Sequence, residues 1–395
     1  MRVEQSVPEL NEADQDKANA MEYHIKQLID SQQGWLSFDE FMQQVLYHPE
    51  LGYYCGRNDP FGRQGDYVTA PQISPLFSQA LAIQCQQILS QWQHGQASIL
   101  EIGAGSGEMA AELMRYLAHQ QCLPKQYAIW EISPSLRQKQ KQYIQKTVPH
   151  LMPYFVWYED WPAHWRGIIL ANEVLDALPV KLWQWHRSSV QEWGIGLQEN
   201  RLVWQQAEPD TILAETINHI QQSLGGHEWV DGYYSEAHVG IAPWIGQLAQ
   251  SLEEGVVLLF DYGYPRAEYY RQQRPTGTLK CFYQHISHED PLIHLGCQDI
   301  TAHVDFTTVI EQAYAQGMTL EGFCTQADFL LSCGIDNLTP SDYTMQDAPK
   351  VSLAQQLKQL LMPEEMGEIV KVMGLSKGYS ECLQGFERRD LSRLL

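Results

Sequence analysis

The segment 98–109, SILEIGAGSGEM, constrains the fold of this chain more than any other stretch. Its apolar start, with Ile99, Leu100 and Ile102, is typical of a buried parallel strand. Glycines at alternate positions follow, and Glu108 opens a pattern with apolar residues on one face that predicts a helix to His119. A strand, a glycine turn and a helix bring backbone N–H groups close to a ligand, so the segment predicts an α/β protein with a ligand site here.

The spacing of these glycines selects between two classes of cofactor. A dinucleotide-binding turn has the spacing G-x-G-x-x-G and holds a pyrophosphate at the helix N-terminus. Here the spacing is G-x-G-x-G, formed by Gly103, Gly105 and Gly107. Glu108 occupies the place of the third glycine of the dinucleotide pattern, and its carboxylate would repel pyrophosphate. With Glu101 just before the glycines, the segment resembles motif I of class I S-adenosylmethionine (SAM) methyltransferases; SAM carries a sulfonium cation and no phosphate, so acidic walls suit it.

A second acidic residue supports this cofactor. In such folds a second strand ends in an acid that accepts hydrogen bonds from the ribose hydroxyls. Residues 127–130 form a predicted strand, and Glu131 follows it directly. We therefore predict that Glu101, the three glycines and Glu131 bind SAM. A glycine turn beside a chance acid is the alternative that remains open at this point.

Composition argues against several classes of function. The chain has 26 Lys and Arg against 48 Asp and Glu residues, and its net charge of −22 argues against a nucleic-acid backbone as the main partner. No apolar run approaches the roughly 20 residues of a membrane helix. The acidic, polar segment 1–20 lacks the features of a signal or transit peptide, so we predict a cytoplasmic location. Eight scattered cysteines without a C-x-x-C pair indicate reduced thiols and no metal site.

The segment 171–180 provides the first candidates for catalysis. A buried strand over 167–170 leads into Asn172 and Glu173, and ligands of doubly wound sheets bind beyond the carboxyl ends of the strands. Asp176 follows three residues later and shares a face with Glu173 if a helical turn begins there. The alternative is that Asn172 or Glu173 only caps a helix.

Two later segments provide further candidates. A buried strand over 256–260 ends at Asp261. In 298–306, QDITAHVDF, the alternation of Thr301, His303 and Asp305 predicts a strand with these side chains on one face. A histidine between carboxylates can perform acid–base catalysis, but a structural or substrate-positioning role is an open alternative.

The loop 51–77 is rich in Gly, Pro and Asp, and long loops of this kind are often functional. Thr69 and Ser74 are candidate helix N-caps, with Pro75 at the first helical position after Ser74. We expect Thr69, Pro71 and Ser74 to close over the cofactor. Near the C-terminus, the pattern predicts helices over 352–361 and 364–373 that pack on the outside.

Several stretches together resemble the MidA-like family of SAM-dependent methyltransferases, which includes a mitochondrial assembly factor for respiratory complex I. The stretches that carry the resemblance are GYYCGRNDPFGRQGDYVTAPQIS (52–74), LEIGAGSGEM (100–109), WEISPSLRQKQ (130–140), ANEVLDALPV (171–180), FDYGYPRAEYY (260–270) and DITAHVDF (299–306). One position departs from the pattern, because the family usually reads TAPE-x-S where this chain has Gln72.

The resemblance implies the α/β fold class, with a Rossmann-like class I methyltransferase sheet, an N-terminal helical and loop extension, an inserted subdomain and C-terminal helices. We predict a disordered tail over 1–18, N-terminal helices and a cofactor-covering loop over 19–80, and a SAM-binding domain over 81–334. Its insertion is expected at about 183–245, and a C-terminal helical segment over 335–395.

The resemblance also implies methylation of a protein arginine to symmetric dimethylarginine, on a complex I subunit in the mitochondrial members. The expected partner is thus a protein with an exposed arginine; the sequence leaves the oligomeric state open, a dimer included. Two alternatives remain: a SAM-fold scaffold that binds a partner with little turnover, and a nicotinamide-dependent oxidoreductase, against which Glu108 argues.

Overall fold

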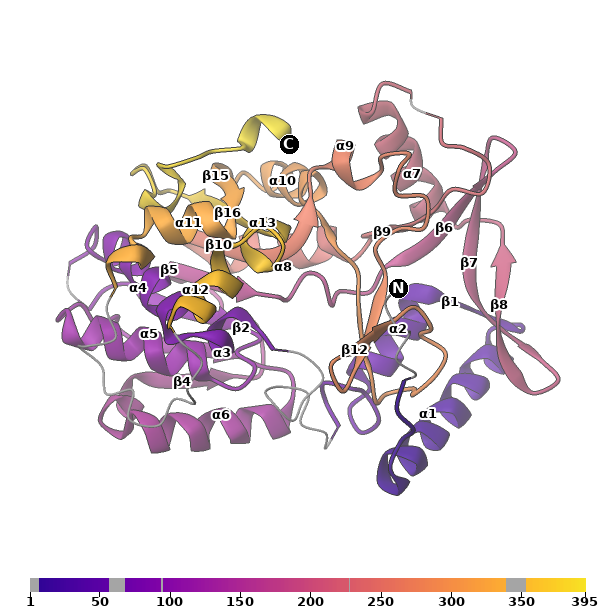
Figure 1. Cartoon of the computed structure of the whole chain (residues 1–395), viewed down its shortest axis with the longest axis horizontal. Helices are drawn as coiled ribbons and strands as arrows, with labels where there is room; N and C mark the ends of the chain where they lie inside the picture. The colour runs from indigo at the N-terminus through magenta and orange to yellow at the C-terminus, as the bar shows by residue number, and fades with distance from the viewer. Residues whose placement is uncertain (1–6, 57–67, 94, 227, 339–352) are drawn as a thin grey trace. The chain divides into compact units, whose positions relative to one another are not determined.

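The structure, a computed structural model, describes residues 7–56, 68–93, 95–226, 228–338 and 353–395. The chain divides into two compact units (Figure 1). Unit 1 consists of the chain up to residue 67 with residues 175–242 and 264–308, and unit 2 consists of residues 68–174, 243–263 and 309–395. Most of the segment 183–245 therefore clusters with the N-terminal part of the chain. Residues 57–67 of the predicted loop lie outside the described residues.

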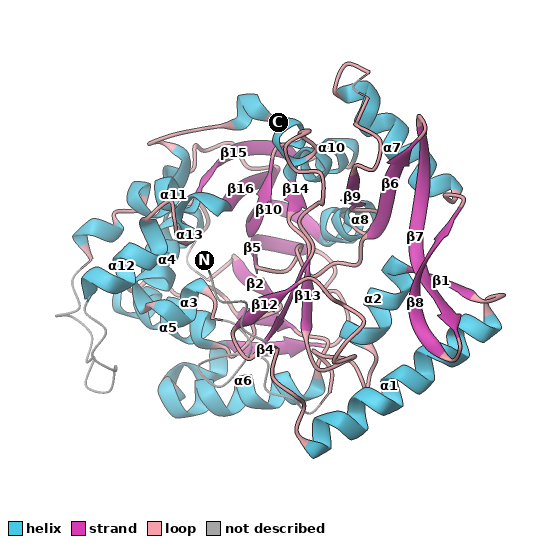
Figure 2. Ribbon diagram, turned by 45° about the vertical axis from the view of Figure 1, so that its right-hand side comes forward, coloured by secondary structure: helices cyan, strands magenta, loops and turns pink. Residues whose placement is uncertain are grey.

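Unit 2 is built on a twisted, mostly parallel sheet (Figure 2). Its strands are β2 (Ser98–Ile102), β3 (Tyr127–Trp130), β4 (Phe155–Tyr158), β5 (Trp165–Asn172), β10 (Leu252–Tyr264), β15 (Thr319–Thr325) and β16 (Val370–Lys377). They lie in the order β15-β16-β10-β5-β2-β3-β4. The strands from β10 to β4 are parallel to their neighbours, and β16 is antiparallel to both β10 and β15. The order reverses between β2 and β5, which makes this the doubly wound arrangement and confirms the predicted Rossmann-like class.

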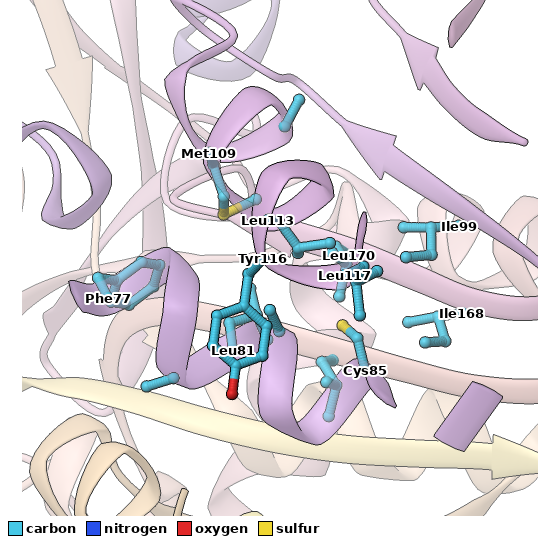
Figure 3. Packing of buried hydrophobic residues seen from close by; sticks show 14 of the residues in the cluster. Phe77, Leu81, Cys85, Ile99, Met109, Leu113, Tyr116, Leu117, Ile168 and Leu170 are labelled. Atoms are coloured by element: carbon cyan, nitrogen blue, oxygen red, sulfur yellow. The ribbon is translucent and has the colours of Figure 1, made fainter. Parts of the chain in front are cut away.

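Helices cover both faces of this sheet (Figure 2). They are α3 (Ala70–Ile73), α4 (Pro75–Leu89), α5 (Glu108–His119), α6 (Pro134–Thr147), α8 (Ile241–Ser251), α10 (Phe306–Ala315), α11 (Gln326–Ser332), α12 (Leu353–Leu361) and α13 (Met366–Ile369). On one face, side chains of α4 and α5 such as Leu81 and Leu113 pack against Ile99 of β2 and Ile168 of β5 (Figure 3). This close-packed layer fixes the start of α5 relative to the strand ends.

Local sequence signals explain why these helices begin where they do. The Ser74 hydroxyl accepts a hydrogen bond from the Leu76 N–H, and Pro75 is the first residue of α4. The Ser133 hydroxyl caps α6 in the same way. In α5 the cap position is Gly107, whose left-handed φ of +82° a side chain would strain. The predicted bounds of α5 and β3 agree with the structure.

The predicted helix over 364–373 is wrong. Only a short turn of helix, α13, forms there, and β16 then runs through the sheet between β10 and β15. All residues of β16 except Lys377 are buried, so both faces of the strand carry apolar side chains. The spacing of Met366, Ile369, Val370 and Met373 imitates a helical stripe, and periodicity cannot separate a short helix from a strand buried on both faces.

Unit 1 combines helices with two antiparallel sheets. The larger sheet contains β1 (Trp35–Ser37), β6 (Lys181–His186), β7 (Ser189–Gln198), β8 (Arg201–Ala207) and β9 (Tyr234–Ala237), and the smaller one β11 (Lys280–Tyr283), β12 (Ile286–His288) and β13 (Asp299–Thr301). Its helices are α1 (Glu12–Ser31), α2 (Phe38–Tyr47), α7 (Thr211–Ser223) and α9 (Arg266–Tyr269). Glu199 and Asn200, both with positive φ, form the hairpin turn between β7 and β8. None of the helices in the described ranges is long and apolar enough to span a membrane.

Two local predictions for unit 1 are wrong. We expected disorder to residue 18, but α1 begins at Glu12, because Asn11 caps it by accepting a hydrogen bond from the Asp14 N–H. We also expected one strand through 301–305. Instead β13 ends at Thr301 and β14 (Val304–Asp305) begins after a break, since the Ala302 N–H donates to the Asp176 carbonyl and leaves the small sheet.

Lys181 joins four elements of unit 1. This buried lysine of β6 lies 3.2 Å from Asp39 of α2, 2.8 Å from Glu192 of β7 and 3.0 Å from Asp210, the N-cap of α7. These partners hold the pKa of the lysine above its usual value despite burial, and the lysine in turn helps to lower the pKa of Asp210.

Replacing Lys181 by Met is expected to destabilise unit 1 by about 3–5 kcal/mol, because it leaves a buried carboxylate without its cation. Urea denaturation followed by tryptophan fluorescence measures the loss. Lys358→Met, at an exposed lysine of α12, is the matched control and is expected to stay within about 0.5 kcal/mol of the wild type. Equal stability of the two variants would contradict this role.

Candidate functional site

The strand register of unit 2 brings the predicted site residues to one edge of the sheet. Ile102 of β2 is paired with both Trp130 of β3 and Ala171 of β5, so the three strands end at one level. The next residues are Gly103 after β2, Glu131 after β3 and Asn172, the last residue of β5. The pairing of Phe260 with Asn172 places Asp261 one residue further along the same edge. This edge is the crevice where doubly wound sheets bind ligands.

The glycine turn needs its glycines for backbone shape and for close packing. Gly103 and Gly105 have φ of +66° and +51°, in the left-handed region. A Cβ on Gly103 would lie 3.3 Å from the Val174 side chain, and one on Gly107 would lie 3.4 Å from Gln140. The Gly103 N–H donates to the Trp130 carbonyl at 3.0 Å, which joins the turn to β3. The turn is thus held between β3, the segment that follows β5, and α6.

Glu131 is a buried carboxylate with both oxygens in use. Its Oε1 accepts from the Ser133 N–H at 3.0 Å, and its Oε2 accepts from Gln140 Nε2 at 3.0 Å. Burial raises the pKa of Glu131, while these hydrogen bonds and the charge of Arg137 lower it. Each carboxylate oxygen can accept a second hydrogen bond, so the group retains the capacity to bind two hydroxyls.

The Glu101 side chain is almost completely buried. Only 2% of its surface is exposed, and it accepts a hydrogen bond from the Tyr127 hydroxyl at 2.7 Å. Burial raises the pKa of Glu101 from its ordinary value of 4.5 to about 7, with a contribution from the charge of Glu131. Its observed hydrogen bond joins β2 to β3 beside the glycine turn, and a direct contact with SAM stays a prediction.

Glu173 stands out at the end of β5 because its backbone is strained. Its φ of +54° is unusual for a residue with a side chain and costs on the order of 1–3 kcal/mol. The Glu173 N–H donates to the Phe260 carbonyl at 2.8 Å, and its Oε1 lies 3.2 Å from Asn172 Nδ2 and 3.4 Å from the Ala70 N–H. No helix begins after Asn172 or Glu173, so neither is the N-cap of a following helix, as that alternative expected.

Asp261 positions this strained segment. The side chain is fully buried, and its Oδ2 accepts from the Val174 N–H at 3.0 Å while Oδ1 accepts from the Tyr262 N–H at 2.9 Å. These contacts are to backbone groups at the ends of β5 and β10. They assign Asp261 the role of holding the chain after Glu173 in place.

The predicted covering residues lie around α3. Thr69 precedes this helix, Pro71 lies within it, and Ser74 ends it. Ser74 is buried and donates to Gln356 of α12 at 2.7 Å. Gln72 Oε1 accepts from the Thr69 N–H at 3.3 Å, as a glutamate at this position would. The glutamine that stands here in place of the family's glutamate therefore preserves the helix cap.

Three predicted residues belong to unit 1. Asp176 is buried in a turn rather than a helix, so the expected helical face shared with Glu173 is wrong. Asp305 pairs with Arg266 at 3.1 Å and accepts from Thr308 at 2.7 Å, and this buried ion pair gives it a structural role. The His303 N–H donates to Thr278 Oγ1 at 3.0 Å. A catalytic role for Asp176 or His303 stays a prediction.

The sequence reasoning missed Gln140, which contacts both the glycine turn and Glu131. Gln140 Nε2 donates to the Gly105 carbonyl at 3.1 Å, and its Oε1 accepts from Trp157 Nε1 at 3.0 Å. A signal was present in the sequence, because Leu136, Gln140 and Ile144 form the buried stripe of α6 and a polar residue in such a stripe needs partners.

The residues present fit SAM better than a dinucleotide. The segment 98–114 contains no Lys or Arg, and three acidic residues lie in or beside the turn: Glu101, Glu108 and Glu131. Burial also raises the pKa of Glu108, in the first turn of α5. Carboxylates suit a sulfonium and an ammonium group and repel a pyrophosphate.

Within the described ranges, no group of three or more His, Cys, Asp and Glu could hold a metal ion. Fold and site together define a class I SAM-dependent methyltransferase.

Comparison with known proteins places the chain in a family. Residues 80–324 match the model of a family described as S-adenosyl-L-methionine-dependent methyltransferases, and the chain belongs to this family. A crystal structure of a COG1565 superfamily member from Burkholderia thailandensis bound to S-adenosyl-homocysteine is 34% identical, with a TM-score of 0.91 over 99% of this chain and 100% of that one. These findings confirm the predicted family, fold class and cofactor.

The curated relatives are named protein arginine methyltransferase NDUFAF7, mitochondrial. The Danio rerio protein is 29% identical over 85% of this chain and 82% of its own length, and the Homo sapiens protein is 27% identical over 91% and 83%. Their names contradict our prediction of a cytoplasmic location. That prediction was wrong because the composition of an N-terminal segment does not determine the compartment in which the folded chain acts.

The raised pKa of Glu101 leads to a prediction about how the stability of the protein depends on pH. A carboxyl with a higher pKa in the folded state stabilises the protein fully below about pH 4.5, and this contribution is lost as the pH rises through about 7. Glu101→Gln keeps an acceptor for Tyr127 and removes the titration. We expect the variant to gain on the order of 3 kcal/mol relative to the wild type between pH 5 and pH 8 in denaturation measurements. A difference that does not change with pH would contradict this.

Proposed function

We propose that this chain transfers a methyl group from SAM to an arginine side chain of a protein, with symmetric dimethylarginine as the product. The names of the relatives, protein arginine methyltransferases, support the choice of arginine. The observation that carries the proposal is Glu173, a partly exposed residue directly after β5. Its strained backbone donates to the Phe260 carbonyl, and its carboxylate accepts from Asn172 and from the Ala70 N–H. Strain maintained in this way is characteristic of functional positions.

The chemistry of arginine explains why a carboxylate is needed there. A guanidinium has a pKa above 12 and is a cation whose nitrogens are poor nucleophiles. Glu173 holds the cation through charge-assisted hydrogen bonds and turns one nitrogen toward the methyl group. SAM, when bound, supplies a methyl group on a sulfonium sulfur, so a C–N bond forms as the C–S bond breaks. The sulfur keeps the electron pair of the C–S bond and leaves as S-adenosylhomocysteine, and the methylated nitrogen gives one proton to solvent. The protein contributes mainly proximity and orientation.

The other predicted residues take supporting roles in this proposal. Glu131 binds the ribose hydroxyls, and the backbone from Gly103 to Gly107 lies against the amino-acid part of the cofactor. Asn172 holds the Glu173 carboxylate at 3.2 Å. Thr69, Pro71 and Ser74 cover the cofactor through α3.

We further propose a subunit of respiratory complex I as the substrate protein, on the resemblance to the family that includes the complex I assembly factor. The acidic character of the chain, with a net charge of −22, suits a substrate segment rich in arginine.

Glu173→Gln is expected to reduce methyl transfer at least about a hundredfold and to leave the affinity for S-adenosylhomocysteine within about threefold, because the amide keeps the shape and loses the charge. Transfer is measured as label from SAM in dimethylarginine of acid-hydrolysed acceptor protein. Glu364→Gln, at an exposed glutamate of unit 2, is the control and should be fully active.

The outcomes of this experiment separate the alternatives. Label in another amino acid would overturn the choice of arginine and keep the methyltransferase. Stable binding of a partner without turnover by the wild type, unchanged in Glu173→Gln, would favour a scaffold with a SAM fold.

Binding of S-adenosylhomocysteine by the wild type is expected to be micromolar in calorimetric titration and to weaken at least about tenfold in Glu131→Ala, because each lost hydrogen bond to a charged group costs about 1.5–3 kcal/mol. NAD serves as the control ligand. Saturable NAD binding without S-adenosylhomocysteine binding would revive the oxidoreductase alternative.

A further inference from the structure

Gln140 is a fully buried amide whose polar atoms all meet the elements that surround the predicted cofactor site. It belongs to α6, and none of its surface is exposed. Its Nε2 donates to Glu131 Oε2 at 3.0 Å and to the Gly105 carbonyl at 3.1 Å, which uses both of its hydrogens. Its Oε1 accepts from Trp157 Nε1 at 3.0 Å. One side chain therefore joins the glycine turn after β2, the acid after β3 and the end of β4.

The three contacts fix the orientation of the amide. Exchanging its oxygen and nitrogen would place the oxygen against a carboxylate and a carbonyl, and would face the NH₂ group with the donor Trp157 Nε1. The indole is itself held, since Lys141 Nζ lies 5.2 Å from its ring centroid. The amide thus has one arrangement that satisfies every partner.

The orientation matters most for Glu131. A buried carboxylate is stable as an anion only where donors replace its hydration. The Ser133 N–H donates to one oxygen of Glu131, Gln140 donates to the other, and the Ile132 N–H adds a smaller contribution. Ser133 N–H, a backbone group of the same segment, fixes Oε1, and Gln140 fixes Oε2. Without Gln140 the carboxylate can rotate about its last torsion, and one oxygen loses its donor.

We propose that Gln140 is a positioning residue that sets the Glu131 carboxylate for the two ribose hydroxyls and holds the glycine turn at a fixed distance from it. This inference rests on the proposed role of Glu131. Gln140 does not contact the cofactor in this account; it acts through Glu131 and Gly105, so its loss should affect recognition of the ribose more than recognition of the rest of the ligand.

The test compares S-adenosylhomocysteine with its 2′,3′-dideoxy analogue, which lacks both hydroxyls, by calorimetric titration of the full chain. The wild type is expected to prefer the hydroxylated ligand at least about tenfold. In Gln140→Leu this preference falls to about threefold or less, while the affinity for the dideoxy analogue changes by less than about threefold. Gln138→Leu, an exposed glutamine of the same helix, is the matched control and keeps the wild-type preference.

Trp157→Phe provides a second route if the Gln140 variant does not fold. It keeps an aromatic ring and removes the N–H that donates to Gln140 Oε1, so the preference for the hydroxylated ligand is expected to fall by about two- to fivefold. Any change in packing from the smaller ring that weakens both ligands equally would leave the ratio unchanged.

The outcomes separate this inference from the proposal on which it rests. A wild type that binds both ligands equally would overturn the role of Glu131. If the wild type discriminates and Glu131→Ala does not, but Gln140→Leu keeps the full preference, the role of Gln140 is overturned. Equal weakening of both ligands in Gln140→Leu would also overturn it, because that result indicates a general structural contribution.

Discussion

Backbone pairing between β2, β3 and β5 is the constraint on which the rest of unit 2 depends. Because Ile102 pairs with Trp130 on one side and Ala171 on the other, three strand ends are level, and a one-residue slip would move every candidate residue to the other face or away from the edge. The α4 and α5 side chains packed against Ile99 and Ile168 hold this register from one face. Strand alignment therefore sets where the candidate site residues lie, and their side-chain contacts only adjust these positions.

Two kinds of carboxylate occupy this edge of the sheet. Glu101 and Asp261 are buried: Glu101 accepts from the Tyr127 hydroxyl and joins β2 to β3, and Asp261 accepts from backbone N–H groups and holds the segment after β5. Glu131 and Glu173 lie where strands end, and each combines a fixed backbone with an oxygen able to accept further hydrogen bonds. The absence of Lys and Arg over 98–114 leaves this edge acidic. Such a distribution matches a cationic cofactor beside a cationic substrate and explains why acids are tolerated where dinucleotide folds have glycine.

Much of this arrangement was predictable from the sequence, and the exceptions have physical causes. The strand, turn and helix of 98–119 carry strong local signals, and α5 runs from Glu108 to His119 as expected. The strand β16 was missed because a strand buried on both faces has no alternation. Asp305 was taken as a catalytic candidate since its partner Arg266 is distant in sequence. Gln140 was overlooked for the same reason, because its three partners come from three separate elements.

A crystal structure of the chain with S-adenosylhomocysteine tests the central claim most directly. The account predicts the ribose hydroxyls within hydrogen-bonding distance of the Glu131 carboxylate, the homocysteine part along the turn from Gly103 to Gly107, and the sulfur facing the end of β5 near Glu173. A ligand bound elsewhere in unit 2, or a ribose held by other residues with Glu131 turned away, would contradict it.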